Sequence, residues 1–255
     1  MKAALVPRIP EIALAEFDAD YRRAEIEHSA ELETTVVELE NAARAADMPA
    51  CDLFTGAHRT LLDVGCGIGT VPFLFARNHP DATVIGVDIN ADSIAYAREH
   101  YGPQAANLSY QTGRVEDLGE HFRNVDLVIC VGALHHFPDL RRALDQIMGV
   151  LADDGMFLLS DLNRENIHAH FSADELKRID AIRKLADKPR YNRLKRQGYL
   201  TGKKMRRLLT LMSFQAAYTP AEIAQTLGSA YAFKGRMSGL NYILAAYRKT
   251  AASQP

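Results

Sequence analysis

The chain has 255 residues, 47% of them hydrophobic and 24% charged, with a formal net charge of −2, so it can bury a full core as one large domain or one domain with appended segments. Its apolar runs are too short to span a membrane and its start is too short an apolar stretch for a signal peptide, so we expect a cytoplasmic protein without a membrane partner. Cys51, Cys66 and Cys130 show no spacing typical of a metal site or a disulfide framework, so no metal is expected.

The N-terminal residues, from about Pro10 to Met48, are predicted to form one or two helices. Their apolar positions are spaced loosely among many acids, so we expect a peripheral segment and not a core unit. Residues 1–50 are assigned to an N-terminal helical lid. Phe17 and Tyr21 lie four residues apart and are candidates to contact a substrate from one helix face, with ordinary packing as the alternative.

From Thr60 the pattern changes to alternating strands and helices. The clearest helix is predicted at Leu140–Leu151, where six apolar residues fall on one face and Pro138 or Asp139 opens the helix. Such alternation with short loops is typical of a doubly wound α/β sheet. The strand candidates are Thr60–Val64, Thr83–Asp88, Leu108–Thr112, Val125–Cys130 and Met156–Asp161.

After Asp161 the alternation stops, and residues 163–218 are predicted to form a helical insertion. Thr219-Pro220-Ala221-Glu222 has the form of a capping box. The last two strands, Tyr231–Met237 and Leu240–Tyr247, are too close for a parallel crossover and must form an antiparallel hairpin. The predicted fold is therefore a doubly wound, mostly parallel, seven-stranded Rossmann-like sheet in residues 51–255 that ends in this hairpin.

A glycine-rich turn follows the first predicted strand and indicates a nucleoside-bearing ligand. Gly65, Gly67 and Gly69 stand at alternate positions, and Asp88 ends the next strand, where it can accept hydrogen bonds from ribose hydroxyls. Dinucleotide binding is the rival interpretation, but its turn has the spacing Gly-x-Gly-x-x-Gly. Asp63 at the head of the turn would also repel a phosphate, and it suits a cationic group such as an α-amino group.

Three motifs give the chain a resemblance to the class I S-adenosylmethionine-dependent methyltransferases, from about Thr60 to Lys249. They are Leu61–Thr70, Val84–Asn90 and Ile129–Phe137. The resemblance implies S-adenosylmethionine as the cofactor. Its implied contacts are Asp63 near the methionine amino group, Asp88 on the ribose and Ile89 against adenine, within a set comprising Asp63, Gly65, Cys66, Gly67, Gly69, Asp88, Ile89, Val115, Glu116, Val131 and Gly132.

The segment Gly113–Leu118 departs from the family pattern at the adenine end. Relatives often carry Asp where this chain has Arg114, and that acid hydrogen-bonds the adenine amino group. Glu116 is the candidate to replace it, with a surface role as the alternative, and the Val115 backbone is expected to meet the ring.

Two histidines follow the fourth predicted strand, and the resemblance places them near the transferred methyl group. Alignment and exclusion of water can supply most of the acceleration of methyl transfer, but a hydroxyl acceptor must also lose its proton, which a histidine can take. His136 is favoured as this base, with Asp161 as a possible orienter, and His135 is the second catalytic candidate. The alternative, that both only shape the loop, stays open.

The segment 177–207 holds 13 Lys/Arg and two acids. A solvated helix face is the simplest interpretation, ahead of attraction for an anionic acceptor and then RNA. Apolar residues near its end, among them Met205 and Met212, are candidates to contact a hydrophobic acceptor, with docking onto the sheet edge as the alternative.

These observations predict methyl transfer from S-adenosylmethionine to an oxygen or nitrogen of a small-molecule metabolite, either anionic or aromatic and apolar. Two alternatives stay open: an RNA methyltransferase that docks through residues 177–207, and a non-catalytic, S-adenosylmethionine-binding regulatory partner. A homodimer is compatible with the sequence.

Overall fold

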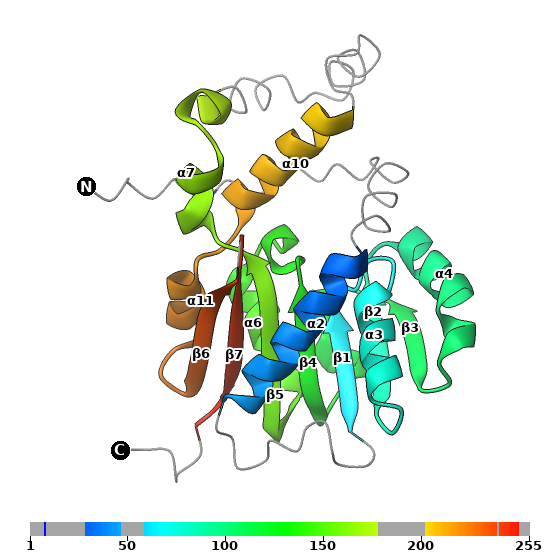
Figure 1. Cartoon of the computed structure of the whole chain (residues 1–255). Coiled ribbons are helices and arrows are strands. Elements are labelled where there is room, and N and C mark those ends of the chain that lie inside the picture. The colour runs from blue at the N-terminus through cyan, green and yellow to red at the C-terminus, as the bar shows by residue number, and fades with distance from the viewer. Residues whose placement is uncertain (1–7, 9–28, 47–58, 178–201, 239, 250–255) are drawn as a thin grey trace.

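The computed structural model of the chain describes residues 8, 29–46, 59–177, 202–238 and 240–249 (Figure 1). Within them seven strands form one sheet in the order β3-β2-β1-β4-β5-β7-β6. The first five strands are parallel, while β7 runs antiparallel to both β5 and β6, which confirms the predicted architecture. The strands are β1 (Thr60–Val64), β2 (Thr83–Asp88), β3 (Leu108–Thr112), β4 (Val125–Val131), β5 (Leu151–Leu162), β6 (Tyr231–Ser238) and β7 (Asn241–Arg248).

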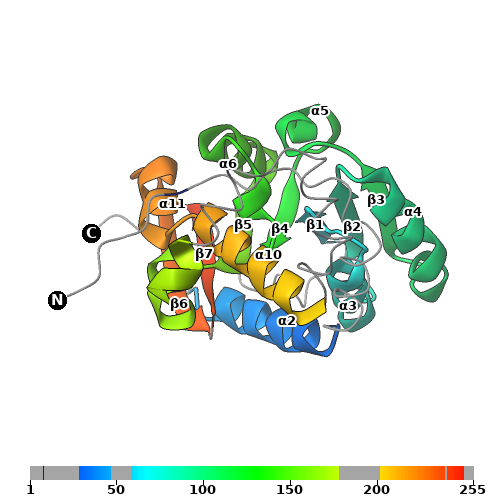
Figure 2. The same cartoon turned by 90° about the horizontal axis from the view of Figure 1, so that it is seen from above.

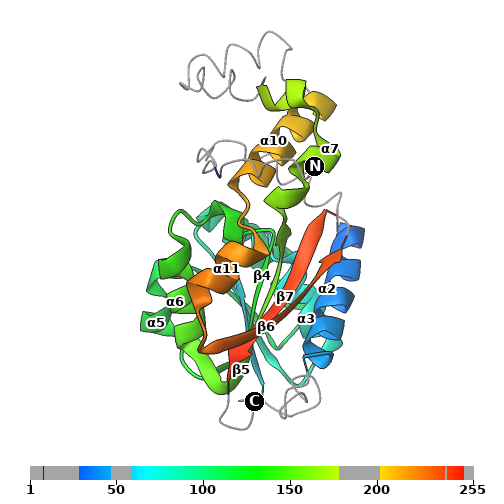
Figure 3. The same cartoon turned by 90° about the vertical axis from the view of Figure 1, so that its left-hand side faces the viewer.

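Helices cover both faces of this sheet, as Figure 3 shows edge-on. One face carries α2 and α3, and the other carries α5, α6 and α11. The described helices are α2 (Ser29–Arg44), α3 (Thr70–Asn78), α4 (Ala91–His100), α5 (Leu118–His121), α6 (Leu140–Val150), α7 (Ile167–His170), α10 (Gly202–Ala216) and α11 (Pro220–Leu227). None of them is long and apolar enough to cross a membrane.

The predicted helix starts are confirmed by their capping bonds. At α6 the Asp139 side chain accepts a hydrogen bond from the backbone N–H of Arg142 at 3.0 Å. At α11 the Thr219 hydroxyl accepts from the N–H of Glu222 at 3.1 Å, and the Glu222 carboxylate accepts from the N–H of Thr219 at 2.7 Å, which completes the capping box. These local signals place α6 and α11 on the sheet with a defined start.

Helix α2 corrects one expectation. It is not peripheral: Val36, Leu39 and Ala43 are at most 1% exposed and pack in the core between α3 and the strands. Their spacing of three and then four residues is a narrow helical stripe, which Val37, 52% exposed beside it, obscures in the sequence. The lid assignment for residues 1–50 otherwise stays a prediction, because most of the earlier residues, Phe17 and Tyr21 included, lie outside the described residues.

The fold places the carboxyl ends of β1, β2, β4 and β5 along one edge of the sheet. The chain leaves β1 toward β2 on one side and later returns to β4 on the other, so β1 and β4 flank the point where the strand order reverses. Open α/β sheets bind ligands at such a point. Helices α7 and α10 stand beyond this edge, and Figure 2 looks down on it with α10 in front.

Candidate active site

The glycine turn between β1 and α3 adopts a backbone that side chains disfavour. Gly65, Gly67 and Gly69 have φ angles of 78°, 54° and 89°. Packing gives a second reason for two of the glycines. A Cβ at Gly65 would lie 2.5 Å from the Cβ of Ala133, and one at Gly69 would lie 2.5 Å from Cε1 of Tyr110. The turn therefore packs closely against Ala133 and Tyr110, and its backbone carries no side chain at the three glycines that could block a ligand.

Asp88 is held in place at the end of β2 by the glycine turn. Its Oδ2 accepts from the N–H of Gly67 at 2.9 Å, and its Oδ1 accepts from the N–H of Asn90 at 2.8 Å. Each oxygen has a further lone pair, so the fixed carboxylate can also accept hydrogen bonds from a diol. The next residue, Ile89, is 62% exposed, and its apolar side chain beside the carboxylate suits the face of a purine.

Asp63 is a buried carboxylate with an unsatisfied oxygen. It is 1% exposed, and Oδ1 has no hydrogen-bond partner among the described residues. Burial raises the pKa of Asp63 well above its usual range, and the nearby charge of Asp88 raises it further. Because a buried, unpaired carboxylate is costly, this atom is poised for a cationic donor, and the α-amino group of S-adenosylmethionine fits it.

The loop after β3 shows what replaces the family pattern at the adenine end. Arg114, 55% exposed, places its Nε 3.3 Å from Oε2 of Glu116, whose side chain is 14% exposed. One oxygen of Glu116 is thus engaged by Arg114, and an adenine contact by Glu116 stays a prediction. Val115 is buried at this turn.

The loop after β4 opens toward the glycine turn. Gly132 has a φ of 60°, its N–H donates to the carbonyl of Ser160 at 2.8 Å, and a Cβ there would have nothing within 4 Å. This glycine is required by its backbone conformation, and the space around it is open. Val131, half-buried, ends β4, and Cys66, 9% exposed, follows β1. Because β1 and β4 are parallel neighbours, both residues lie at this edge of the sheet.

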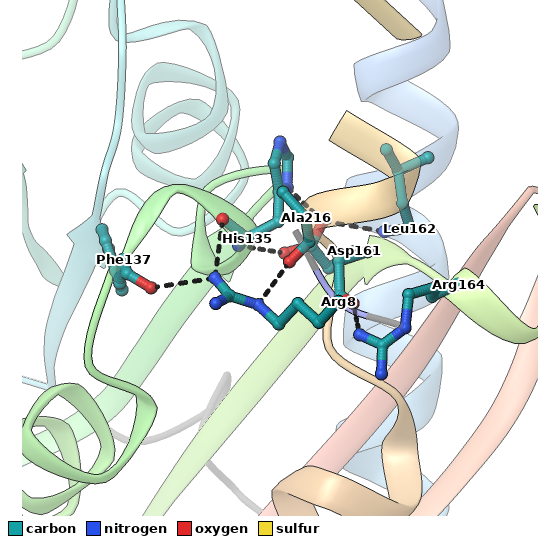
Figure 4. Close-up of polar contacts among 8 residues, drawn as sticks. Arg8, His135, Phe137, Asp161, Leu162, Arg164 and Ala216 are labelled. Atoms are coloured by element: carbon teal, nitrogen blue, oxygen red, sulfur yellow. Dashed lines mark hydrogen bonds and ion pairs between the residues drawn. The ribbon is translucent and has the colours of Figure 1, made fainter. Parts of the chain in front are cut away.

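His135 and Asp161 form a buried pair beside this loop (Figure 4). Nδ1 of His135 lies 2.7 Å from Oδ1 of Asp161, and the His135 N–H donates to Oδ2 at 3.0 Å. Oδ1 also accepts from the N–H of Leu162 at 2.7 Å. The two side chains are 5% and 2% exposed. Because a carboxylate only accepts, we assign a ring proton to Nδ1.

This geometry corrects the sequence-based pairing of Asp161 with His136. Asp161 orients His135, whereas the His136 side chain is exposed and its ring centroid lies 4.1 Å from that of His135. The three residues Leu134–His136 form one 3-10 turn, in which successive side chains point in different directions. Only one of two adjacent histidines can therefore face Asp161, and the sequence did not reveal which one.

The sequence analysis did not identify two arginines that lie beside this pair. Arg164 is 2% exposed; it binds the carbonyl of Ala217 and places Nη2 2.5 Å from Oε1 of Glu222. Arg8 contacts the carbonyls of Ala216 and His135. Neither arginine belongs to a motif, so no local signal marks them.

On the acceptor side the structure describes little of what was predicted. Met212, 4% exposed, packs with Ile167, Phe171 and Phe214 between α7 and α10, and a contact with an acceptor stays a prediction. The Met205 side chain and most of segment 177–207 lie outside the described residues.

Comparison with known proteins places the fold and the site in context. A family model described as "Methyltransferase domain" matches residues 47–216. Ubiquinone biosynthesis O-methyltransferase from Coxiella burnetii (strain Dugway 5J108-111) is 32% identical over 104 residues, 41% of this chain and 44% of that protein. The protein of the same name from Actinobacillus pleuropneumoniae is 30% identical over 111 residues, 42% of this chain and 47% of that protein. The matches thus span less than half the length of these relatives.

Solved structures share the fold across nearly the whole chain. The plantazolicin methyltransferase BpumL in complex with SAH has a TM-score of 0.62 at 14% identity, with 91% of each chain covered. A putative S-adenosylmethionine-dependent methyltransferase from Methanococcus maripaludis has a TM-score of 0.54 at 15% identity, with 92% of this chain and 95% of that chain covered. At these identities the likeness concerns the fold.

Proposed function

Because the chain belongs to the methyltransferase domain family and has the class I fold, we propose that it transfers a methyl group from S-adenosylmethionine to the hydroxyl oxygen of a small molecule. The observation that carries the choice of a hydroxyl is the buried pair of His135 and Asp161. A neutral amine needs no base, whereas a hydroxyl must lose a proton. The named activity of the similar ubiquinone biosynthesis O-methyltransferases supports the same choice.

The residues around the glycine turn would hold the cofactor. Asp63 would receive the α-amino group on its unpaired oxygen, Asp88 the ribose hydroxyls, and Ile89 the adenine face. When bound, S-adenosylmethionine supplies a methyl group that is already activated on a sulfonium. The protein's remaining tasks are to align the acceptor, exclude water and manage one proton.

His135 performs the proton step in this proposal. The hydroxyl proton of the acceptor passes to Nε2, and the ring becomes an imidazolium whose Nδ1–H stays bonded to Asp161 at 2.7 Å. Asp161 thus fixes the tautomer and stabilises the charged ring, and its own two oxygens are held by three hydrogen bonds. The apolar cluster of Ile167, Phe171, Leu211, Met212 and Phe214 packs α7 against α10 beside this edge, and an aromatic or apolar acceptor stays a prediction.

The other sequence-based predictions receive no support from a described residue. RNA docking through residues 177–207, a non-catalytic regulatory role, a homodimer and a cytoplasmic location stay predictions. The first two become outcomes of the same assay.

The test is a transfer assay with methyl-labelled S-adenosylmethionine against hydroxylated small-molecule fractions and RNA, followed by mass spectrometry to locate the label. We expect label on a hydroxyl oxygen, with turnover lowered roughly 10²–10⁴-fold in His135→Ala and only a few-fold in the neighbouring control His136→Ala. Label on RNA would favour the docking alternative. Tight cofactor binding without turnover on any fraction would favour the regulatory alternative, and equal effects of the two variants would remove His135 as the base.

A further inference from the structure

Arg8 connects the N-terminal part of the chain to the loop that carries His135 (Figure 4). Its Nε donates to the carbonyl of Ala216 at 2.7 Å, across 208 residues of sequence. Its Nη2 lies 3.4 Å from the carbonyls of both His135 and Phe137. The guanidinium carbon lies 3.8 Å from the centroid of the Tyr218 ring. One side chain thus joins three separate parts of the chain.

The carbonyls that Arg8 binds lie at the end of helix α10 and around the 3-10 turn after β4. Ala216 is the last residue of α10, His135 lies within the 3-10 turn Leu134–His136 after β4, and Phe137 follows that turn. Carbonyls at helix ends lack an intrahelical partner and favour a cation. The two Nη2 contacts are long for N–H···O bonds, so they act as a shared, charge-assisted contact and not as two full hydrogen bonds. The face of Tyr218 supplies further attraction for the cation.

A second arginine holds the adjacent peptide from the other side. Arg164 binds the carbonyl of Ala217, while Arg8 binds that of Ala216. The Tyr218 hydroxyl donates to the carbonyl of Phe137 at 2.9 Å, so the segment after α10 is also tied to the loop after β4. The end of α10 and the loop after β4 are therefore held as one unit, with Arg8 between them.

His135 is fixed on three sides by these contacts. Its ring and its N–H both bind Asp161, and its carbonyl faces Arg8. The direction of Nε2 depends on this backbone as much as on the ring's own bond to Asp161. A small displacement of a proton-accepting atom lowers its efficiency strongly, because the reaction depends on alignment.

We propose that Arg8 is a positioning residue, which sets the loop after β4 against the end of α10 so that Nε2 of His135 faces the acceptor. This inference rests on the proposed function for the role of His135. It adds that Arg8 takes part in the acceptor half of the site.

The test compares Arg8→Ala, Arg8→Lys and a control in the full chain. The control is Arg77→Ala, which removes an exposed guanidinium whose Nη2 lies 3.4 Å from Glu33 on α2. We expect kcat to fall about 10- to 100-fold in Arg8→Ala, with the affinity for S-adenosylhomocysteine within about twofold of wild type. Arg8→Lys should recover part of the loss, since it keeps the charge but not the planar fork. Arg77→Ala should match wild type in both measurements.

A second measurement does not need turnover. The ¹⁵N resonances of the His135 ring report its tautomer, and they should move toward a mixed tautomer in Arg8→Ala and stay unchanged in Arg77→Ala. Unchanged kcat together with an unchanged His135 spectrum in Arg8→Ala would overturn the proposal. Equal losses of kcat in Arg8→Ala and Arg77→Ala would also overturn it, as the sign of a general stability effect. A wild-type protein that methylates no hydroxyl would instead refute the proposed function, while the spectra still decide the role of Arg8.

Discussion

Replacing Asp161 by Asn tests the proposed chemistry most directly. The change keeps the shape of the side chain and removes the charge that faces His135. The carboxylate accepts hydrogen bonds from the Nδ1–H of His135, the N–H of His135 and the N–H of Leu162. An asparagine whose oxygen takes the Oδ1 position keeps the bonds from Nδ1 and Leu162, but its amide nitrogen then faces the His135 N–H. In the opposite orientation two bonds are lost instead of one.

The magnitudes follow from this count. One buried donor left without an acceptor costs about 1–3 kcal/mol in the free energy of unfolding. Turnover should fall further, roughly 10²–10⁴-fold, because the charged ring loses the carboxylate that stabilises it. Cofactor affinity should stay near that of wild type, since Asp63 and Asp88 are untouched.

The assay pairs steady-state turnover with calorimetric titration of S-adenosylhomocysteine and with denaturant unfolding. Asp154→Asn is a matched control, because this carboxylate is 54% exposed near the start of β5 and lies 3.8 Å from Arg59. Turnover of Asp161→Asn within about threefold of wild type, in a protein that remains folded, would refute the assignment of the pair as the proton-accepting unit.

Three further predictions concern ligand binding and pH. Asp88→Ala should weaken binding of S-adenosylhomocysteine by about 1–3 kcal/mol, because the ribose hydroxyls lose their acceptor, and an unchanged calorimetric affinity would contradict this. Asp63→Asn should weaken binding of the ligand yet stabilise the ligand-free protein at neutral pH. Burial, and then the charge of Asp88, raise the pKa of Asp63, so the stability of the wild type falls as pH rises from the unfolded-state pKa toward the folded-state pKa. The melting temperature should therefore fall less between pH 5 and pH 8 in the variant than in the wild type. Burial alone would raise the pKa of Glu222, but hydrogen bonds from the Thr219 N–H and from Arg164 lower it overall. The carboxylate of Glu222 therefore stabilises the fold above its unfolded-state pKa, and this stabilisation is lost as pH falls through the folded-state pKa. The free energy of unfolding of Glu222→Gln should depend less on pH in the acid range than that of the wild type.

Local sequence patterns predicted the sheet well because burial on both faces leaves a clear signal. The bounds of β1, β2 and β3 agree with the predicted ranges, and for β1 and β2 the reason is an apolar run between turns, which has few alternatives. Strand β5 begins at Leu151, five residues before the predicted start at Met156. There Asp153 and Asp154 interrupt the apolar run, and a register shift between Val125 and Leu127 accommodates the longer strand.

The arrangement around the glycine turn could be predicted from the sequence, whereas the contacts around His135 could not. Gly67 and Asp88 belong to motifs at the ends of the neighbouring strands β1 and β2, whose parallel pairing brings the two residues into hydrogen-bond contact. His135 was the second choice because the phase of a single 3-10 turn decides between it and His136. Arg8 had no signal, since its contacts with Ala216 and His135 depend on how distant segments pack and not on any neighbour in sequence.

The close approach of Gly65 to Ala133 affects how loss-of-activity variants at Gly65 should be interpreted. A Cβ at Gly65 would overlap that of Ala133, so any substitution at Gly65 pushes on the loop that bears His135. A screen for loss of activity would return Gly65 variants beside those of Asp88, and both would be catalogued as cofactor-binding defects. Titration would separate them, because an Asp88 variant fails to saturate with donor, whereas a Gly65 variant that still saturates remains slow. The phenotype of a Gly65 variant therefore reports on both the cofactor turn and the loop that carries His135.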